Sequence, residues 1–217
     1  MSQIGLPFEW ADDNDGRGFI VSDANAVAVR HLENWRAWPV MTSVLSGPPR
    51  SGRSTLGRMF AGLAGGDVID DAEGQGDEAL FHAWNRAQNQ RRPLLMIARS
   101  APQHWTVALP DLKSRLAAAP HVEIAEPDDA LATALLERGL ARIGAGWAPD
   151  LPTWLTRRIE RSYATVAGVL ACLDRASLAQ SRRITVPFAR ETLQQAGYLP
   201  IVFTDTDTDS ASDTESS

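Results

Sequence analysis

The stretch "GPPRSGRST", residues 47–55, has the composition of a phosphate-binding loop. Such loops read G-x-x-x-x-G-K-[S/T]: their backbone N–H groups surround the phosphates, the lysine reaches the terminal phosphates, and the hydroxyl holds Mg²⁺. The pattern is met by Gly47, Gly52, Ser54 and Thr55, while Arg53 stands at the lysine position. Because arginine presents a planar fork in place of a compact point charge, we expect the loop to grip phosphate without placing the charge where lysine would. Phosphate binding and catalysis are therefore separable in this chain.

An acidic pair follows the loop. In "GDVIDDAEG", Val68 and Ile69 predict a short apolar strand that ends in Asp70 and Asp71. A lone acidic pair is usually part of a turn, but on a strand tip beside a phosphate-binding loop it can hold Mg²⁺ and polarise water. If nucleotide binds, we expect Ser54 and Asp70 to be the Mg²⁺ ligands.

The segments that must position these groups alternate between strands and helices up to about residue 126. Strands are predicted in residues 39–47, 68–69, 92–100 and 121–127, and helices over 54–63 and around the buried Leu80, Phe81 and Trp84. Before the first strand, Asp23 is predicted to cap a helix with a buried face of Val27, Ala28, His31, Leu32 and Trp35. This alternation implies a parallel sheet with right-handed crossovers, whose ligands bind at the carboxyl edge. The loop and the acidic pair both belong to that edge.

Beyond Pro127 the pattern is helical only. An amphipathic helix opened by Asp128 or Asp129 carries Leu131, Leu135, Leu136, Leu140 and Ile143. Further helices are predicted around residues 151–159, through Val166, Val169, Leu170 and Leu173, and in "TVPFARETLQQAG", which ends near Gly197. These segments predict a small helical lid on the sheet.

Composition limits the class of protein. The 217 residues are 44% hydrophobic, which supports a substantial core; no apolar run reaches membrane-spanning length, and the N-terminus has no signal-peptide pattern, so we expect a cytoplasmic protein. The single Cys172 lies in an apolar helical pattern and is interpreted as a buried structural thiol. Residues 204–217 hold five acidic residues and no basic one, which predicts a disordered acidic tail. The rest of the chain has 21 basic and 22 acidic residues, without the basic stripe and interleaved aromatics of a nucleic-acid binder.

Several stretches in a fixed order carry a family resemblance over about residues 3–200. They are "FIVSDANAVAV", "WRAWP", "VIDDAE", "RPLLMIARSAP", "LPDLKSRL" and "LDRASLAQSRRITVPFARETL". The chain resembles the Hda-like, DnaA-related AAA+ regulators of replication initiation. The resemblance implies an α/β fold, a P-loop AAA+ parallel sheet with a C-terminal helical lid. It divides the chain into a clamp-binding tether (1–10), an AAA+ base domain (11–126), a helical lid domain (127–203) and the acidic tail (204–217).

The resemblance also implies partners. "QIGLPF" is similar to the peptide by which Hda docks on the sliding clamp, the beta subunit of DNA polymerase III, through Gln3, Ile4, Leu6, Pro7 and Phe8. An extended segment before Pro7 would let Gln3 form hydrogen bonds while apolar side chains fill a pocket. In "LPDLKSRL", Arg115 matches the arginine finger that acts in trans on ATP held by DnaA. Neither direct nucleic-acid binding nor membrane association is expected, since the family's DNA-reading domain is absent.

Three departures from the family concern the nucleotide site. Arg53 replaces the lysine, the short interval between the loop and "VIDD" leaves room for four of the usual five strands, and Ala164 stands where the family has a lid arginine. A preference for arginine throughout the chain, in which Lys113 is the only lysine, accounts for the first departure alone. We therefore expect a degenerate adaptor that does not turn over ATP and requires no cofactor, with weak ADP or ATP binding, with Mg²⁺, left open. The expected function is negative regulation of replication initiation; the alternatives are an active AAA+ loader or remodeller and a non-catalytic interaction scaffold.

Overall fold

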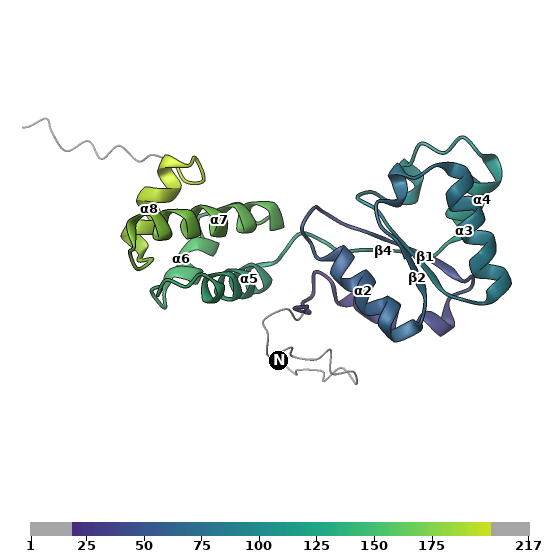
Figure 1. The fold of residues 1–217 in the computed structure, drawn as a ribbon, viewed down its shortest axis with the longest axis horizontal. Helices are drawn as coiled ribbons and strands as arrows, with labels where there is room; N and C mark the ends of the chain where they lie inside the picture. Colours follow the sequence, from purple (N-terminus) through teal and green to yellow (C-terminus); the bar gives the residue numbers. More distant parts are fainter. Residues whose placement is uncertain (1–18, 201–217) are drawn as a thin grey trace, which may run out of the picture.

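A computed structural model describes residues 19–200 and shows a sheet domain and a helical domain joined after the last strand (Figure 1). The sheet strands are β1 (Thr42–Ser46), β2 (Asp67–Ile69), β3 (Leu94–Ile97) and β4 (His121–Glu123). They are all parallel, in the order β2-β3-β1-β4. The predicted four-stranded parallel sheet is therefore confirmed. Both central strands, β1 and β3, are buried along their whole length, which explains their nearly continuous apolar sequences.

Helices cover both faces of the sheet. The sheet domain contains α1 (Ala26–Glu33), α2 (Arg53–Ala64), α3 (Asp77–Gln90) and α4 (Pro110–Ala118), with short 3₁₀ turns η1 (Trp35–Ala37), η2 (Ala72–Gly74) and η3 (Pro102–His104). Successive strand residues point to opposite faces. Leu45, Leu95 and Ile97 join a core with α1 and α2, whereas Val44, Leu94 and Met96 join a core with α3 and α4.

The first helix differs from the prediction in its start and in its buried face. It begins at Ala26, after Asn25 and not after Asp23. The Asn25 side chain is bound into the preceding turn: its Oδ1 accepts from the Ser22 N–H (3.0 Å) and its Nδ2 donates to the Ile20 carbonyl (2.9 Å). Because this turn sets where the helix starts, Val29 is buried, and the predicted core residue Val27 is 67% exposed.

The helical domain consists of α5 (Asp129–Arg142), α6 (Leu151–Thr156), α7 (Tyr163–Gln180) and α8 (Val186–Gln195). Asp128 caps α5, since its carboxylate accepts from the Leu131 N–H at 2.7 Å. The helix predicted over 151–159 ends at Thr156, although Ile159 is still buried. Helices α5 and α7 approach closely at Gly139, where an added Cβ would lie 2.2 Å from a Leu170 methyl carbon.

None of the helices within residues 19–200 combines the length and the apolar composition that crossing a bilayer would require.

Candidate functional site

The phosphate-binding-loop sequence connects β1 to α2 at the carboxyl edge of the sheet. Gly47 and Gly52 have φ angles of 154° and 87°, and Arg50 has a φ of 66°, which is uncommon outside glycine. Glycine is required at 47 for a second reason, because a Cβ there would lie 2.9 Å from the Ile124 carbonyl oxygen. At Gly52 a Cβ would lie 2.9 Å from the Phe19 ring. The phenyl ring of Phe19 therefore lies directly against the backbone of the loop.

Arg53 is the first residue of α2, and its side chain is bound within the protein. The Arg53 guanidinium donates to the carbonyl of Ala98, just beyond the end of β3. Burial lowers the pKa of Arg53, while the charges of Asp70, Glu73 and Asp71 oppose this effect. The side chain at the lysine position thus ties the loop to the central strand.

The two hydroxyl residues that follow differ in their surroundings. Ser54 is exposed, whereas Thr55 is half-buried and its Oγ1 accepts from Arg58 Nη2 at 3.2 Å. Ser51, inside the loop, has a buried hydroxyl that finds no hydrogen-bond partner among the described residues. Of these three residues, Ser51 and Thr55 line the cavity described below, and Ser54 does not.

The acidic pair lies at the end of β2 and is exposed. The Asp70 carboxylate accepts from the Asp71 N–H at 3.0 Å, and Asp71 has a positive φ of 53°. Arg99 Nη2 lies 4.0 Å from Asp71 Oδ1. The parallel order β2-β3-β1 puts the acidic pair and the loop at the same edge of the sheet, and the charges of Asp70 and Asp71 act to raise the pKa of Arg53.

Glu73 is a third carboxylate at this edge, and sequence reasoning missed it. It accepts from the N–H groups of Arg99 (3.0 Å) and Ser100 (3.2 Å) and from the Ser100 hydroxyl (2.8 Å). Burial raises the pKa of Glu73, but these hydrogen bonds outweigh it, so the pKa lies below its usual value. The signal in the sequence was weak, because Glu73 lies in a turn and its partners are in another segment.

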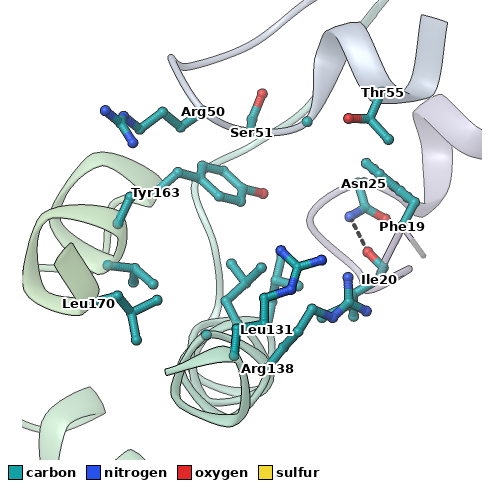
Figure 2. A pocket seen from close by; sticks show the side chains of 16 residues that line it. Phe19, Ile20, Asn25, Arg50, Ser51, Thr55, Leu131, Arg138, Tyr163 and Leu170 are labelled. Atoms are coloured by element: carbon teal, nitrogen blue, oxygen red, sulfur yellow. Dashed lines mark hydrogen bonds between the residues drawn. The ribbon is translucent and has the colours of Figure 1, made fainter. Parts of the chain in front are cut away.

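A cavity of about 350 Å³ lies between the sheet domain and the helical domain. Figure 2 shows Phe19 and Asn25 on one side, Tyr163 and Leu170 on the other, and the loop residues Arg50 and Ser51 above. Tyr163 Oη donates to the Ala125 carbonyl at 3.2 Å, and burial, with Glu126 and Asp128 contributing, raises its pKa to about 12. This tyrosine stays neutral at physiological pH and connects α7 to the segment between the domains.

Helix α5 contributes two arginines to the cavity lining that the sequence analysis did not single out. Arg138 and Arg142 line it together with Leu131, Leu135 and Gly139. These positions form one stripe of the helix, at intervals of three and four residues. The spacing of these residues could be seen in the sequence. The leucines among them, however, predicted a buried face of the helix and not the wall of a cavity.

Arg115, the predicted trans-acting arginine, lies on α4, at the end of the sheet domain that is far from the helical domain in Figure 1. Its Nη1 donates to Asn85 Oδ1, and the guanidinium lies 4.5 Å from the centre of the Phe81 ring. Arg115 is half-buried and does not line the cavity of its own chain.

Other predicted positions do not reach the cavity or cannot be placed. Ala164, at the lid position where the family has an arginine, is exposed, and the cavity is lined instead by Tyr163, Val166 and Ala167 from the same helix. The clamp-binding residues Gln3, Ile4, Leu6, Pro7 and Phe8 and the acidic tail 204–217 lie outside the described residues.

Two side chains at this edge of the sheet are bound within the protein, and a third lies against the loop. The cation at position 53 is bound to Ala98, the Glu73 carboxylate is bound to Ser100, and Phe19 lies against Gly52. Of the predicted nucleotide-site groups, Arg53 is thus hydrogen-bonded within the protein, whereas Ser54 and Asp70, the expected Mg²⁺ ligands, are exposed.

Known proteins share the lid sequence and the fold. The family model for the Hda lid domain matches residues 129–193. An uncharacterized protein of Haemophilus influenzae is 30% identical over 116 residues, 53% of this chain and 50% of that protein. The chain thus aligns with about half the length of this relative.

Solved structures agree on the architecture. Domain III of the Thermotoga maritima replication initiation protein DnaA superposes with a TM-score of 0.70 and 12% identity, covering 90% of this chain and 99% of that one. AMPPCP-bound DnaA from Aquifex aeolicus superposes with a TM-score of 0.57 and 17% identity, covering 83% of this chain and 67% of that one. A Thermotoga maritima RuvB mutant superposes with a TM-score of 0.55 and 11% identity, covering 80% of this chain and 68% of that one. At these identities the likeness is one of fold, and the match to the Hda lid domain is confined to residues 129–193, less than half of the chain.

Proposed function

We propose that this protein is a negative regulator of replication initiation that promotes the hydrolysis of ATP bound to DnaA. The observation that carries the proposal is the match of residues 129–193 to the Hda lid domain, on a chain whose fold resembles DnaA domain III. In this function the protein would bind the replicase sliding clamp through Gln3, Ile4, Leu6, Pro7 and Phe8. It would supply Arg115 to nucleotide held by DnaA.

The surroundings of Arg115 support a role toward a partner. The arginine lies on α4, away from the cavity of its own chain, and is held by Asn85 and Phe81. A guanidinium has five N–H donors, so the bond to Asn85 leaves others for a phosphate oxygen. The stacking on Phe81 limits the rotamers of a long side chain, which would reduce the entropy lost on docking.

The arginine-finger role can be tested by measuring hydrolysis of DnaA-bound ATP with a DNA-loaded clamp. Arg115→Ala should remove most of the stimulation, because arginine fingers contribute about 10³ to 10⁵ in rate in other phosphoryl-transfer systems. Arg115→Lys should rescue poorly, since lysine keeps the charge and loses the forked donor geometry. Lys113→Ala, an exposed change on the same helix, is the matched control. Parental stimulation by Arg115→Ala would refute the finger and leave occlusion of DnaA as the mechanism.

Clamp binding is a separate part of the proposal. Gln3→Ala, or Leu6→Ala with Phe8→Ala, should abolish binding to the clamp because each removes an anchor of a short extended peptide. The measurement is clamp affinity by surface plasmon resonance, with the melting temperature as the control for folding. If the affinity is unchanged, the scaffold alternative gains support.

We further propose that the chain does not turn over ATP itself and at most binds ADP or ATP weakly. The hydrogen bonds that Arg53 makes to Ala98 and Glu73 makes to Ser100 support this part. A phosphate-release assay on the pure protein should give no appreciable rate. Turnover that disappears in Asp70→Ala would instead establish the ATPase alternative.

A further inference from the structure

The helical domain carries a cluster in which two arginines from different helical regions lie against one tryptophan. Trp154, on α6, is half-buried. The Arg158 guanidinium carbon is 4.7 Å from the centre of a Trp154 ring, and that of Arg190, on α8, is 5.7 Å away. We call Trp154, Arg158 and Arg190 the Trp154 cluster. Its two positive charges are exposed and held in place by the same aromatic side chain.

No carboxylate neutralises the Trp154 cluster within residues 19–200. The ion pairs found there involve other arginines, namely Arg92, Arg99 and Arg161. The Arg158 guanidinium donates to the Trp154 carbonyl at 3.2 Å. The cluster therefore offers positive charge with unfilled donor positions to an anionic group.

The chain leaves the described part of the structure beside this cluster. Gln194 Nε2 donates to the Pro200 carbonyl at 3.0 Å. Gln194 and Arg190 are four residues apart on α8 and so lie on the same face of the helix. The acidic segment 204–217, with five carboxylates and no basic residue, begins only a few residues beyond Pro200.

We propose that the acidic segment 204–217 of the same chain docks on the Trp154 cluster. Single exposed ion pairs are weak. Here, however, the linker from Pro200 to Asp205 spans about 12 Å if it follows the dimensions of a flexible chain. Such a short linker keeps the carboxylates at an effective concentration in the millimolar range. Several carboxylates of the segment can then form ion pairs with the guanidinium groups of Arg158 and Arg190.

Docking of the acidic segment would screen the cluster from other anions. The acidic segment would occupy donors on Arg158 and Arg190 that another anionic group would need. The inference does not depend on the proposed action on DnaA.

The test is a paramagnetic spin label on the segment, read out at tryptophan indole N–H resonances of the full chain. The label is attached at Ser212→Cys in a Cys172→Ala background, so that it has a single thiol. The Trp154 resonance, assigned with Trp154→Phe, should lose most of its intensity. Trp35 is the matched control, because it has a similar arginine contact, to Arg36 at 4.5 Å, in the sheet domain. Its resonance should be unaffected.

Charge variants decide whether the contact is the proposed one. Arg158→Ala with Arg190→Ala should restore the Trp154 intensity, and so should neutralising Asp205, Asp207, Asp209, Asp213 and Glu215 to the corresponding amides. Arg36→Ala should restore nothing. High salt should weaken the effect, since exposed charges are screened over about 10 Å at 0.1 M.

Three outcomes would overturn the proposal. They are an undiminished Trp154 signal, a loss of signal that survives both sets of charge variants, and a loss that vanishes on dilution, which would assign the contact to a second copy. A measurement without a label covers failure of the cysteine variants to fold: the Trp154 indole shift should move when the five acidic residues are neutralised. If that shift is the same with and without neutralisation, the segment does not occupy the cluster.

Discussion

At position 53 the exchange of lysine for arginine changes what the side chain can reach. The guanidinium is long enough to bind the Ala98 carbonyl at the end of β3, so the loop is attached to the sheet by the residue that would otherwise contact phosphate. We predict that Arg53→Ala lowers the free energy of unfolding by about 1 kcal/mol, the usual net value of a hydrogen bond. Urea denaturation measures this difference.

The control for Arg53 is Arg58→Ala on the same helix. The Arg58 side chain is exposed and donates to Thr55 at 3.2 Å, so its removal should change the unfolding free energy by less. Equal losses for the two variants would contradict a structural role of Arg53.

We expect His31 to make the free energy of unfolding depend on pH. Its Nε2 lies 2.8 Å from Ser43 Oγ, which itself donates to the Pro120 carbonyl, so Nε2 carries the proton in that contact. Burial lowers the pKa of His31 from 6.5. The unfolded state therefore binds protons more readily than the folded state as the pH falls below about 6.5, and the contribution of His31 to stability is lost between that pH and its folded pKa.

We predict a weaker dependence of the unfolding free energy on pH in His31→Gln than in the parent. The measurement is urea denaturation from pH 7.5 downward. His104→Gln, at an exposed position, is the control. Because the pKa of His121 is also lowered, chiefly by burial, part of the parental dependence should remain. A parental slope in His31→Gln would show that the buried histidine is not the group responsible.

Among single residues, the sequence identified the positions of the loop and the acidic pair but not their contacts. Gly47, Gly52 and Asp70 follow from spacing along a strand and a loop. The bonds from Arg53 to Ala98 and from Glu73 to Ser100 join segments more than twenty residues apart, and no local pattern encodes which carbonyl or hydroxyl a long side chain will reach.

At the scale of elements, α5 depends on its first turn, because the helix follows directly after the connection between the domains. The Asp128 carboxylate accepts from Leu131 N–H at 2.7 Å and satisfies a donor that the helix cannot. We predict that Asp128→Ala lowers the melting temperature, with a loss of about 1 kcal/mol in stability. Asp128→Asn retains an acceptor and should stay close to the parent. Equal losses for both would assign the effect to charge instead of capping.

The elements themselves were largely predictable. Buried parallel strands give short, nearly unbroken apolar runs, and three of the strands lay within such predicted segments, while β2 extended one residue earlier. The first helix was predicted less well, because helical periodicity alone does not fix where a helix begins. Asn25 is bound into the turn at Ser22, and this places Val29 inside and Val27 in solvent.

At the scale of the whole molecule, the two domains share side chains. Leu131 is on α5 but belongs to the core of the sheet domain, and Tyr163 of α7 packs in that core as well. We predict that Leu131→Ala increases amide hydrogen exchange at residues 125–128, because it leaves a cavity at the contact between the domains.

Leu136→Ala is the control for this contact. Leu136 is on the same helix but is buried within the helical domain. It should lower stability by a similar amount, in the range of about 2–5 kcal/mol for such truncations, with increased exchange chiefly in the helical domain. Identical exchange patterns in the two variants would contradict a special role of Leu131 between the domains.

The cavity between the domains could not be predicted from the sequence. Its walls come from the segment before α1, the loop at Arg50, and helices α5 and α7, which only the folded arrangement brings together. The sequence shows that Arg138 and Arg142 lie on the same face of α5, but it does not show which surface that face meets.

The border of the shortened sheet has a consequence for self-assembly. Strand β2 pairs with β3 alone among the described residues, so one side of its backbone has no neighbouring strand. It is only three residues long, Asp67 is paired with Arg92 at 2.9 Å, and the exposed Asp70 follows its end. Two copies meeting through this border in an antiparallel register would bring carboxylates together over very few backbone hydrogen bonds. Short, charged borders of this kind oppose polymerisation by strand addition, so the sheet can end at β2 without becoming a template for fibres.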